Sequence, residues 1–212
     1  MRHLNKTTGF TLVEALVSVS ILTIIGTIAI FDLRASSRTD ALNTAARYLA
    51  ADIRSLQSEA LSVKNIKFCA NGSAIQVVCE TSTAVCQVPG NCMPIPPGAM
   101  GASFFANASS YALYAKYNSA SVDWTNTIPG EIIQIHDLAK NGAPNVIISN
   151  LSATFLPQRA DIAFLRQNGA MQLNACAGCT SSPKLSITLK QTQSGETRVV
   201  QLNQVTGRIS IQ

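Results

Sequence analysis

Histidine is almost absent from this sequence: His3 and His136 are the two copies among 212 residues. A His-rich metal site and a Ser/His/Asp catalytic arrangement therefore lack the residues that they need. His136 lies between Ile135 and Asp137, and we interpret it as a strand-end residue rather than as a general base. No glycine-rich loop of the phosphate-binding kind leads into a helix. We expect a protein that is not an enzyme and that holds no cofactor and no metal ion.

Charged residues are scarce as well. Asp, Glu, Lys and Arg make up 13% of the chain, and the formal net charge is +5. This basic excess is too small to indicate a nucleic-acid-binding protein by itself. The length of 212 residues allows one or two domains.

A long apolar run lies near the start of the chain. Residues 10–31 contain one charged side chain, Glu14, and as a helix they would span about 33 Å, enough to cross the hydrocarbon core of a bilayer. A secretory signal ends its apolar stretch with small residues and a cleavage site, whereas here the small residue, Gly9, precedes the run. Cleavage after Gly9 would remove the basic leader, residues 1–9, and keep the helix. The sequence therefore predicts that the helix is a retained part of the mature protein.

Glu14 is the exception within this run. A carboxylate in a lipid-facing helix costs on the order of a few kcal/mol at the bilayer centre, so it indicates either a functional group or a carboxylate at headgroup level. Cleavage after Gly9 would create a free amino group on Phe10, four residues before Glu14. Residues four apart share a helix face. We therefore expect Glu14 to meet its own amine or that of a neighbouring copy.

Residues 9–14, which read GFTLVE, resemble the class III signal of type IV pilins and type II secretion pseudopilins. The resemblance implies that a prepilin peptidase cleaves between Gly9 and Phe10 and methylates the new amino terminus of Phe10. It implies that Glu14 pairs with the amino terminus of an adjacent pilin or pseudopilin subunit during filament assembly. An inner-membrane assembly platform is a further partner that it implies.

A helical pattern continues beyond the apolar run, since residues 32–63 contain no Gly and no Pro. Apolar residues recur there at steps of three and four, which is typical of an amphipathic helix. We expect one helix, with residues 10–31 in the membrane or the filament core and residues 32–64 packed against a globular domain, residues 65–212. The members of the apolar stripe are Leu42, Ala45, Leu49, Ile53, Leu56, Ala60 and Val63.

Short apolar runs and turn residues indicate that this domain is rich in β-structure. Two runs flank Asn71-Gly72-Ser73, which predicts a hairpin. Pro89-Gly90-Asn91 and residues 94–98 together predict an irregular loop. Alternating apolar residues near the end predict a three-stranded meander with turns at Gly195 and Gly207. The fold class is therefore α+β, a long helix packed on an antiparallel sheet. Further strands are expected at residues 111–117, 131–136 and 146–149.

The β-rich part resembles a narrower group, the GspH/FimT minor pilins and pseudopilins. The resemblance implies the type IV pilin fold and a subunit that initiates, or is incorporated into, a type IV pilus or a type II secretion pseudopilus. It also implies a single-pass protein of the bacterial inner membrane, whose C-terminal domain lies in the periplasm before the subunit reaches the pilus or pseudopilus. The residues that carry the resemblance are Phe68-Cys69 and Val78-Cys79 after the helix, residues 162–169, and residues 205–210.

Six cysteines lie beyond the apolar run, and an even number fits an oxidising compartment. Cys69 and Cys79 flank the predicted hairpin and are the first pairing that we expect, with Cys86 and Cys92 as the second. At least two intramolecular disulfides are expected.

The other two cysteines, Cys176 and Cys179, have the CxxC spacing of redox and zinc sites. No second CxxC and no βαβ pattern accompanies them. We therefore interpret them as disulfide cysteines.

Basic residues outnumber acidic ones by six to two from Arg159 onward. Such an excess is either a solvated basic face or a surface that attracts phosphates, so DNA capture for uptake is the alternative function. DNA-binding FimT proteins carry a Gly-Arg-x-Arg motif near the C-terminus. Residues 207–210 read Gly-Arg-Ile-Ser here, so the second arginine of that motif is absent. The candidate DNA contacts are Lys184, Lys190, Arg198 and Arg208.

Overall fold

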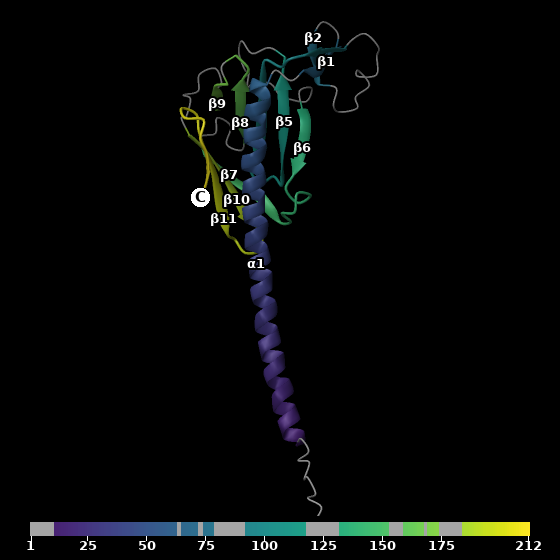
Figure 1. Cartoon of the computed structure of the whole chain (residues 1–212), viewed down its shortest axis with the longest axis vertical. Helices are drawn as coiled ribbons and strands as arrows, with labels where there is room; N and C mark the ends of the chain where they lie inside the picture. The colour runs from purple at the N-terminus through teal and green to yellow at the C-terminus, as the bar shows by residue number, and fades with distance from the viewer. Residues whose placement is uncertain are drawn as a thin grey trace, which may run out of the picture. The chain divides into compact units, whose positions relative to one another are not determined.

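The computed structural model describes residues 11–62, 65–71, 74–78, 92–117, 132–152, 159–167, 169–173 and 184–212. One long helix precedes a set of antiparallel strands (Figure 1), which confirms the α+β class. The chain divides into two compact units, Met1–Thr39 and Asp40–Gln212. The elements in order are α1 Leu12–Leu61, β1 Ile66–Asn71, β2 Ala74–Val78, β3 Cys92–Ile95, β4 Ala99–Phe105, β5 Ser110–Lys116, β6 Ile132–Asp137, β7 Val146–Leu151, β8 Arg159–Leu165, β9 Met171–Leu173, β10 Lys184–Gln191, β11 Thr197–Asn203 and β12 Ile209–Ile211.

Helix α1 runs without interruption from Leu12 to Leu61, as the lack of Gly and Pro after residue 31 predicts. Phe10 and Val63, the expected ends, lie outside the described residues. Three further alanines, Ala41, Ala46 and Ala50, are buried and widen the apolar face of α1 in the second unit. The predicted apolar stripe is confirmed, because six of its members are buried and at most 2% exposed. These are Leu42, Ala45, Leu49, Ile53, Leu56 and Ala60.

The described strands of the second unit form three antiparallel sheets. Five strands have the order β6-β5-β4-β8-β9, four have the order β12-β11-β10-β7, and three have the order β2-β1-β3. One hydrophobic core joins the buried face of α1 to the two larger sheets, and it includes Ile53 of α1, Phe104 of β4 and Ile187 of β10. Figure 1 shows residues 40–61 of α1 lying over these sheets, roughly along the direction of β5 and β8.

The predicted hairpin and the predicted meander are both present. Strands β1 and β2 pair antiparallel, and so do β10 with β11 and β11 with β12. Gly195 and Gly207 lie in the two turns of the meander with φ of 77° and 64°, a region that glycine adopts without steric cost. Strand β7 pairs with the other edge of β10, an arrangement that the sequence did not indicate.

Strand β4 was not predicted, although it lies at the centre of the five-stranded sheet. Its residues Ala99–Phe105 are buried except for the last. Small residues and apolar residues occupy both faces, so the strand lacks the alternation that marks a half-exposed strand.

The prediction of an irregular loop over residues 94–98 was wrong for its first two residues. Pro94 and Ile95 belong to strand β3, where Pro94 lies opposite Lys67 of β1. Strand β3 is an edge strand, which is where a sheet accepts proline, because the missing N–H is not needed for a second neighbour.

Cys69 and Cys92 form a disulfide, so the predicted pairings Cys69–Cys79 and Cys86–Cys92 were both wrong. Strand β1 lies between β2 and β3, and Cys69 faces Val77 on β2 but Cys92 on β3, with a Cα–Cα distance of 4.0 Å. The contact comes from pairing across a long connection, whereas the prediction considered the short hairpin. The expectation of a second disulfide stays a prediction, since the remaining cysteines lie outside the described residues: Cys79, Cys86, Cys176 and Cys179.

Candidate functional site

The first unit presents an exposed apolar helix surface. Its large apolar side chains from Leu12 to Leu33 are between 49% and 82% exposed. The helix is long and apolar enough to cross a membrane, with a mean hydropathy of 2.2 over its best 18 residues. Water is an unfavourable surrounding for such a surface. The segment therefore requires lipid or the apolar helices of other chains around it.

Glu14 lies in the first turn of α1 and is the one charged residue of the described segment 11–31. Thr11 caps this turn: its Oγ1 accepts a hydrogen bond from the amide of Glu14 at 3.3 Å, and its carbonyl accepts one from Ala15 at 3.1 Å. A threonine followed three residues later by glutamate is a capping-box pattern, a signal that our sequence analysis missed. Gly9 and Phe10 lie outside the described residues, so cleavage between them, methylation of Phe10 and the pairing of Glu14 stay predictions.

The hydroxyl groups of this segment are satisfied by the helix itself. Ser18, Ser20, Thr23 and Thr27 each donate a hydrogen bond to a carbonyl oxygen three or four residues earlier, at 2.7–2.8 Å. Such bonds make a hydroxyl acceptable in an apolar surrounding. For the described residues 11–31, Glu14 is then the side chain that still needs a polar partner once water is removed.

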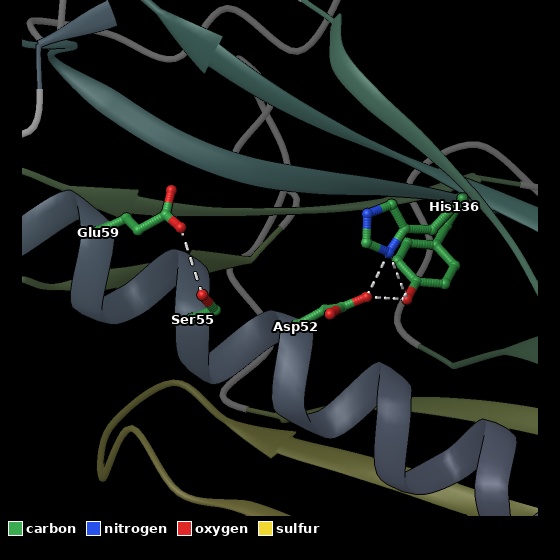
Figure 2. A network of polar contacts seen from close by, with 5 residues as sticks. Asp52, Ser55, Glu59 and His136 are labelled. Atoms are coloured by element: carbon green, nitrogen blue, oxygen red, sulfur yellow. Dashed lines mark hydrogen bonds and ion pairs between the residues drawn. The ribbon is translucent and has the colours of Figure 1, made fainter. Parts of the chain in front are cut away.

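A second polar group joins α1 to the five-stranded sheet within the second unit (Figure 2). Asp52 of α1 accepts hydrogen bonds from the hydroxyl of Tyr111 on β5 and from Nδ1 of His136 on β6, the latter at 2.6 Å. A carboxylate only accepts, so the proton of the imidazole lies on Nδ1. Figure 2 shows His136 directed toward Asp52, with Ser55 and Glu59 farther along the same helix and in contact at 3.4 Å.

The environment fixes the protonation of Tyr111. Burial raises the pKa of its phenol well above the ordinary value, and the hydrogen bond to Asp52 raises it further. The neutral phenol is therefore a permanent donor to Asp52. His136 lies next to the end of β6, as predicted, and its Nε2 is buried without a hydrogen-bond partner in the part of the chain that the structure describes. We interpret the three side chains as a polar clamp between helix and sheet, which no sequence spacing indicated.

We expect Asp52→Ala to lower the free energy of unfolding by about 1–3 kcal/mol, because two largely buried donors lose their acceptor. Denaturant unfolding of the full chain in detergent measures this, with the exposed Asp40→Ala as the matched control, expected within about 0.5 kcal/mol of the parent. Equal stability of the Asp52 and Asp40 variants would contradict the clamp.

The folded state holds Tyr111 neutral. The free energy of unfolding should therefore also fall as pH rises above about 10, where the phenol of the unfolded chain ionises.

An ion pair lies on the face of the five-stranded sheet that points away from α1. Asp161 of β8 is 4% exposed, and its Oδ2 pairs with Nε of Arg159 at 2.8 Å. Burial raises the pKa of the Asp161 carboxyl, and the nearby arginine opposes that shift. No three His, Cys, Asp or Glu side chains lie close enough to hold a metal ion among the described residues.

The candidate DNA contacts are not gathered on one surface. Lys184 and Lys190 share one face of β10 but are six residues apart, roughly 20 Å along the strand. Arg198 lies opposite Leu189, on the face toward α1, and its Nε donates a hydrogen bond to Asn43 of α1 at 2.9 Å. The structure therefore separates Arg198 from the two lysines.

Lys184 and Arg208 both line an open hollow of about 480 Å³ over β10, β11 and β12. Its other side chains are mostly amides and hydroxyls, such as Gln201, Asn203 and Ser210, and none of its lining residues is acidic. The structure thus brings together two of the four candidate contacts.

Residues 4–30 match the family model of the prokaryotic N-terminal methylation motif. The matched range contains Gly9, Phe10 and Glu14. Comparisons with curated proteins and with solved structures found no match. The chain thus carries the methylation motif at its start, and the structure behind it is one long N-terminal helix packed on antiparallel β-sheets, an architecture consistent with the type IV pilin fold.

Proposed function

We propose that the chain is a minor pilin or pseudopilin, a structural subunit that initiates, or is incorporated into, a type IV pilus or a type II secretion pseudopilus. The observation that carries this proposal is the exposed apolar helix with Glu14 as the single charge of its described residues 11–31. A membrane surrounds such a helix with apolar groups first, and a bundle of like helices does so later. The role is structural rather than enzymatic.

The proposed order of events is the one that the resemblance to the class III signal implies. Before assembly the helix spans the bacterial inner membrane once, and the β-rich unit lies in the periplasm, where the Cys69–Cys92 disulfide is stable. A prepilin peptidase removes residues 1–9 and methylates Phe10. The assembly platform then moves the helix from the bilayer into the filament, where Glu14 pairs with the amine of another subunit.

Membership of the GspH/FimT group is the finer part of the proposal. Its support is a cysteine-bearing strand directly after α1 and a C-terminal meander whose last turn contains Gly207. The neighbouring genes would distinguish a type IV pilus from a type II secretion system. A cluster of secretion components supports a pseudopilin, whereas a cluster of minor pilin genes supports a pilus subunit.

We expect the mature protein from the native host to begin at Phe10, because the matched motif places the signal ahead of a retained helix. Amino-terminal sequencing measures this. Gly9→Val should block cleavage and keep the leader, whereas the neighbouring Thr8→Val should be cleaved as the parent is. A mature chain that keeps residues 1–9, or that begins beyond Phe31, would refute the assignment.

DNA capture is the second candidate function, and the shared hollow of Lys184 and Arg208 favours it. Phosphate contacts release counterions, so binding of the full chain to duplex DNA should weaken steeply with salt. Lys184→Gln with Arg208→Gln should weaken binding and flatten the salt dependence, while Lys190→Gln, outside the hollow, serves as the control. Equal loss in the control would indicate a non-specific basic surface.

A further inference from the structure

Two cations follow the end of the apolar segment of α1. Arg34 is exposed and Arg38 is partly exposed, and both come after Leu33, the last exposed large apolar side chain of the first unit. Residues 12–33 span about 33 Å as a helix, close to the roughly 30 Å of the hydrocarbon core of a bilayer. In a membrane, Arg34 would therefore lie where the hydrocarbon ends. Arg38 lies about 6 Å farther along the axis, and its long side chain tilts back toward the headgroup layer, because helix side chains tilt toward the N-terminus.

The two arginines share one side of the helix with exposed apolar side chains. At about 100° per residue, Arg34 and Arg38 lie about 40° apart around the axis. Ile30 and Phe31 lie one turn before Arg34 on this side, and both are exposed. Asp32, the nearest carboxylate, lies about 160° from Arg34 and so on the opposite side. One side of α1 therefore combines an apolar surface with two cations at its end.

The described structure leaves this pair of charges unbalanced. Arg34 and Arg38 are like charges four residues apart, an arrangement that destabilises an isolated helix. The described part of the chain gives neither of them an ion-pair partner. A phosphate group between the two would relieve the repulsion, and the planar guanidinium group binds phosphate through parallel hydrogen bonds. At this depth of a bilayer, phosphate is supplied by the phospholipid headgroups, and a headgroup with net negative charge attracts the arginines further.

We propose that this side of α1 is a binding site for one anionic phospholipid. The phosphate contacts Arg34 and Arg38, and the acyl chains pack on Ile30 and Phe31. The lipid fixes the depth at which the unassembled subunit lies in the bilayer, and the subunit leaves it on entering a filament. The proposal rests on the membrane-spanning state in the proposed function, and it adds the class of lipid and the residues that bind it.

Quenching of tryptophan fluorescence by brominated lipids measures which lipid lies next to the site. The full-length chain is placed in vesicles, with its one tryptophan removed by Trp124→Phe and a reporter introduced by Phe31→Trp. The measured quantity is the binding constant of brominated phosphatidylglycerol relative to that of brominated phosphatidylcholine. We expect a ratio of about five or more for the parent reporter chain, since each arginine near an anionic surface contributes on the order of fivefold.

Matched variants of the reporter chain assign this ratio to the two arginines. Arg34→Gln with Arg38→Gln should lower it to about one, whereas Arg34→Lys with Arg38→Lys should keep most of it, because lysine retains the charge. Arg47→Gln, which changes an exposed arginine of the second unit, should leave the ratio unchanged. A reporter at Leu33→Trp, at similar depth but about 100° around the helix from Arg34, should give a ratio below about two.

Each outcome decides between the alternatives. A ratio near one for the parent reporter chain, or an unchanged ratio in the double glutamine variant, would overturn the proposal. Equal ratios for the reporters at residues 31 and 33 would also overturn it, since the attraction would then be diffuse. Loss of the preference on adding inorganic phosphate, at constant ionic strength, would show a site for any phosphate rather than for a lipid. Absence of quenching by both lipids would instead refute the membrane-spanning state of the proposed function.

Discussion

Glu14→Ala is expected to remain inserted in the membrane and to be cleaved after Gly9, yet its recovery in sheared filaments should fall at least about tenfold. Apolar contacts between helices are non-directional, so the proposed ion pair of Glu14 with the amine of Phe10 on an adjacent subunit would fix the depth of the helix. Removing one partner of a buried pair costs about 3–5 kcal/mol, because the other charge stays buried and unpaired. In the pairing that we propose, the charge left behind would be the amine of Phe10 on an adjacent subunit.

The capped helix start supplies the control for this experiment. A carboxylate in the first turn stabilises a helix by about 0.3–1 kcal/mol, and the hydroxyl of an N-cap residue contributes about 1 kcal/mol. Thr11→Ala removes the cap but keeps the carboxylate, so it should enter filaments nearly as the parent does. Equal defects in the Thr11 and Glu14 variants would show that Glu14 only supports the helix start. If Glu14→Ala entered filaments as the parent does, Glu14 would instead be interpreted as a carboxylate at headgroup level.

Gly101→Ala is expected to destabilise the second unit by about 3 kcal/mol or more, at the upper end of overpacking effects. Tyr114 of β5 lies over Gly101 of β4, and its hydroxyl donates a hydrogen bond to the carbonyl of Ile162 on β8 at 2.8 Å. A Cβ at Gly101 would stand 2.1 Å from that carbonyl oxygen and 2.5 Å from the Tyr114 ring. The oxygen belongs to the backbone of the adjacent strand, so three strands would have to shift.

Thermal unfolding of the full chain in detergent, followed through the tertiary signal of the aromatic residues, measures this effect. Gly26→Ala makes the same chemical change in α1, where a Cβ meets no atom within 4 Å beyond the backbone of its own helix. The Gly26 variant should unfold at the parental temperature or above it, since alanine is favoured over glycine in a helix by about 1 kcal/mol. Similar transitions for both variants would contradict the close packing at Gly101.

The parts of the fold that are encoded locally were predictable. Steps of three and four marked the buried face of α1, and alternation marked the meander of β10, β11 and β12. Strand β4 escaped prediction because it is buried on both faces and has no period. The Cys69–Cys92 pairing escaped because strand β3 approaches β1 across a long connection, and a local pattern carries no information on such a contact.

In the candidate site, too, the features encoded locally were predictable and those that depend on long-range contacts were not. Glu14 was evident as a single charge in an apolar run, and the Thr11 cap was present in the spacing from threonine to glutamate. In the clamp, Tyr111 lies 59 positions and His136 lies 84 positions after Asp52 in the sequence, so only the folded chain reveals that the three are in contact. Arg198 points toward α1 because it lies opposite Leu189 in the pairing of β10 with β11. The amino-acid composition carries no information on that register.

The most direct test of the filament role is the intact mass of this chain in the filament fraction sheared from its native host. We predict that the chain is present there, begins at Phe10, carries one added methyl group and retains the Cys69–Cys92 disulfide. A chain found only in the membrane fraction, with residues 1–9 still attached, would contradict the claim that it is a processed filament subunit.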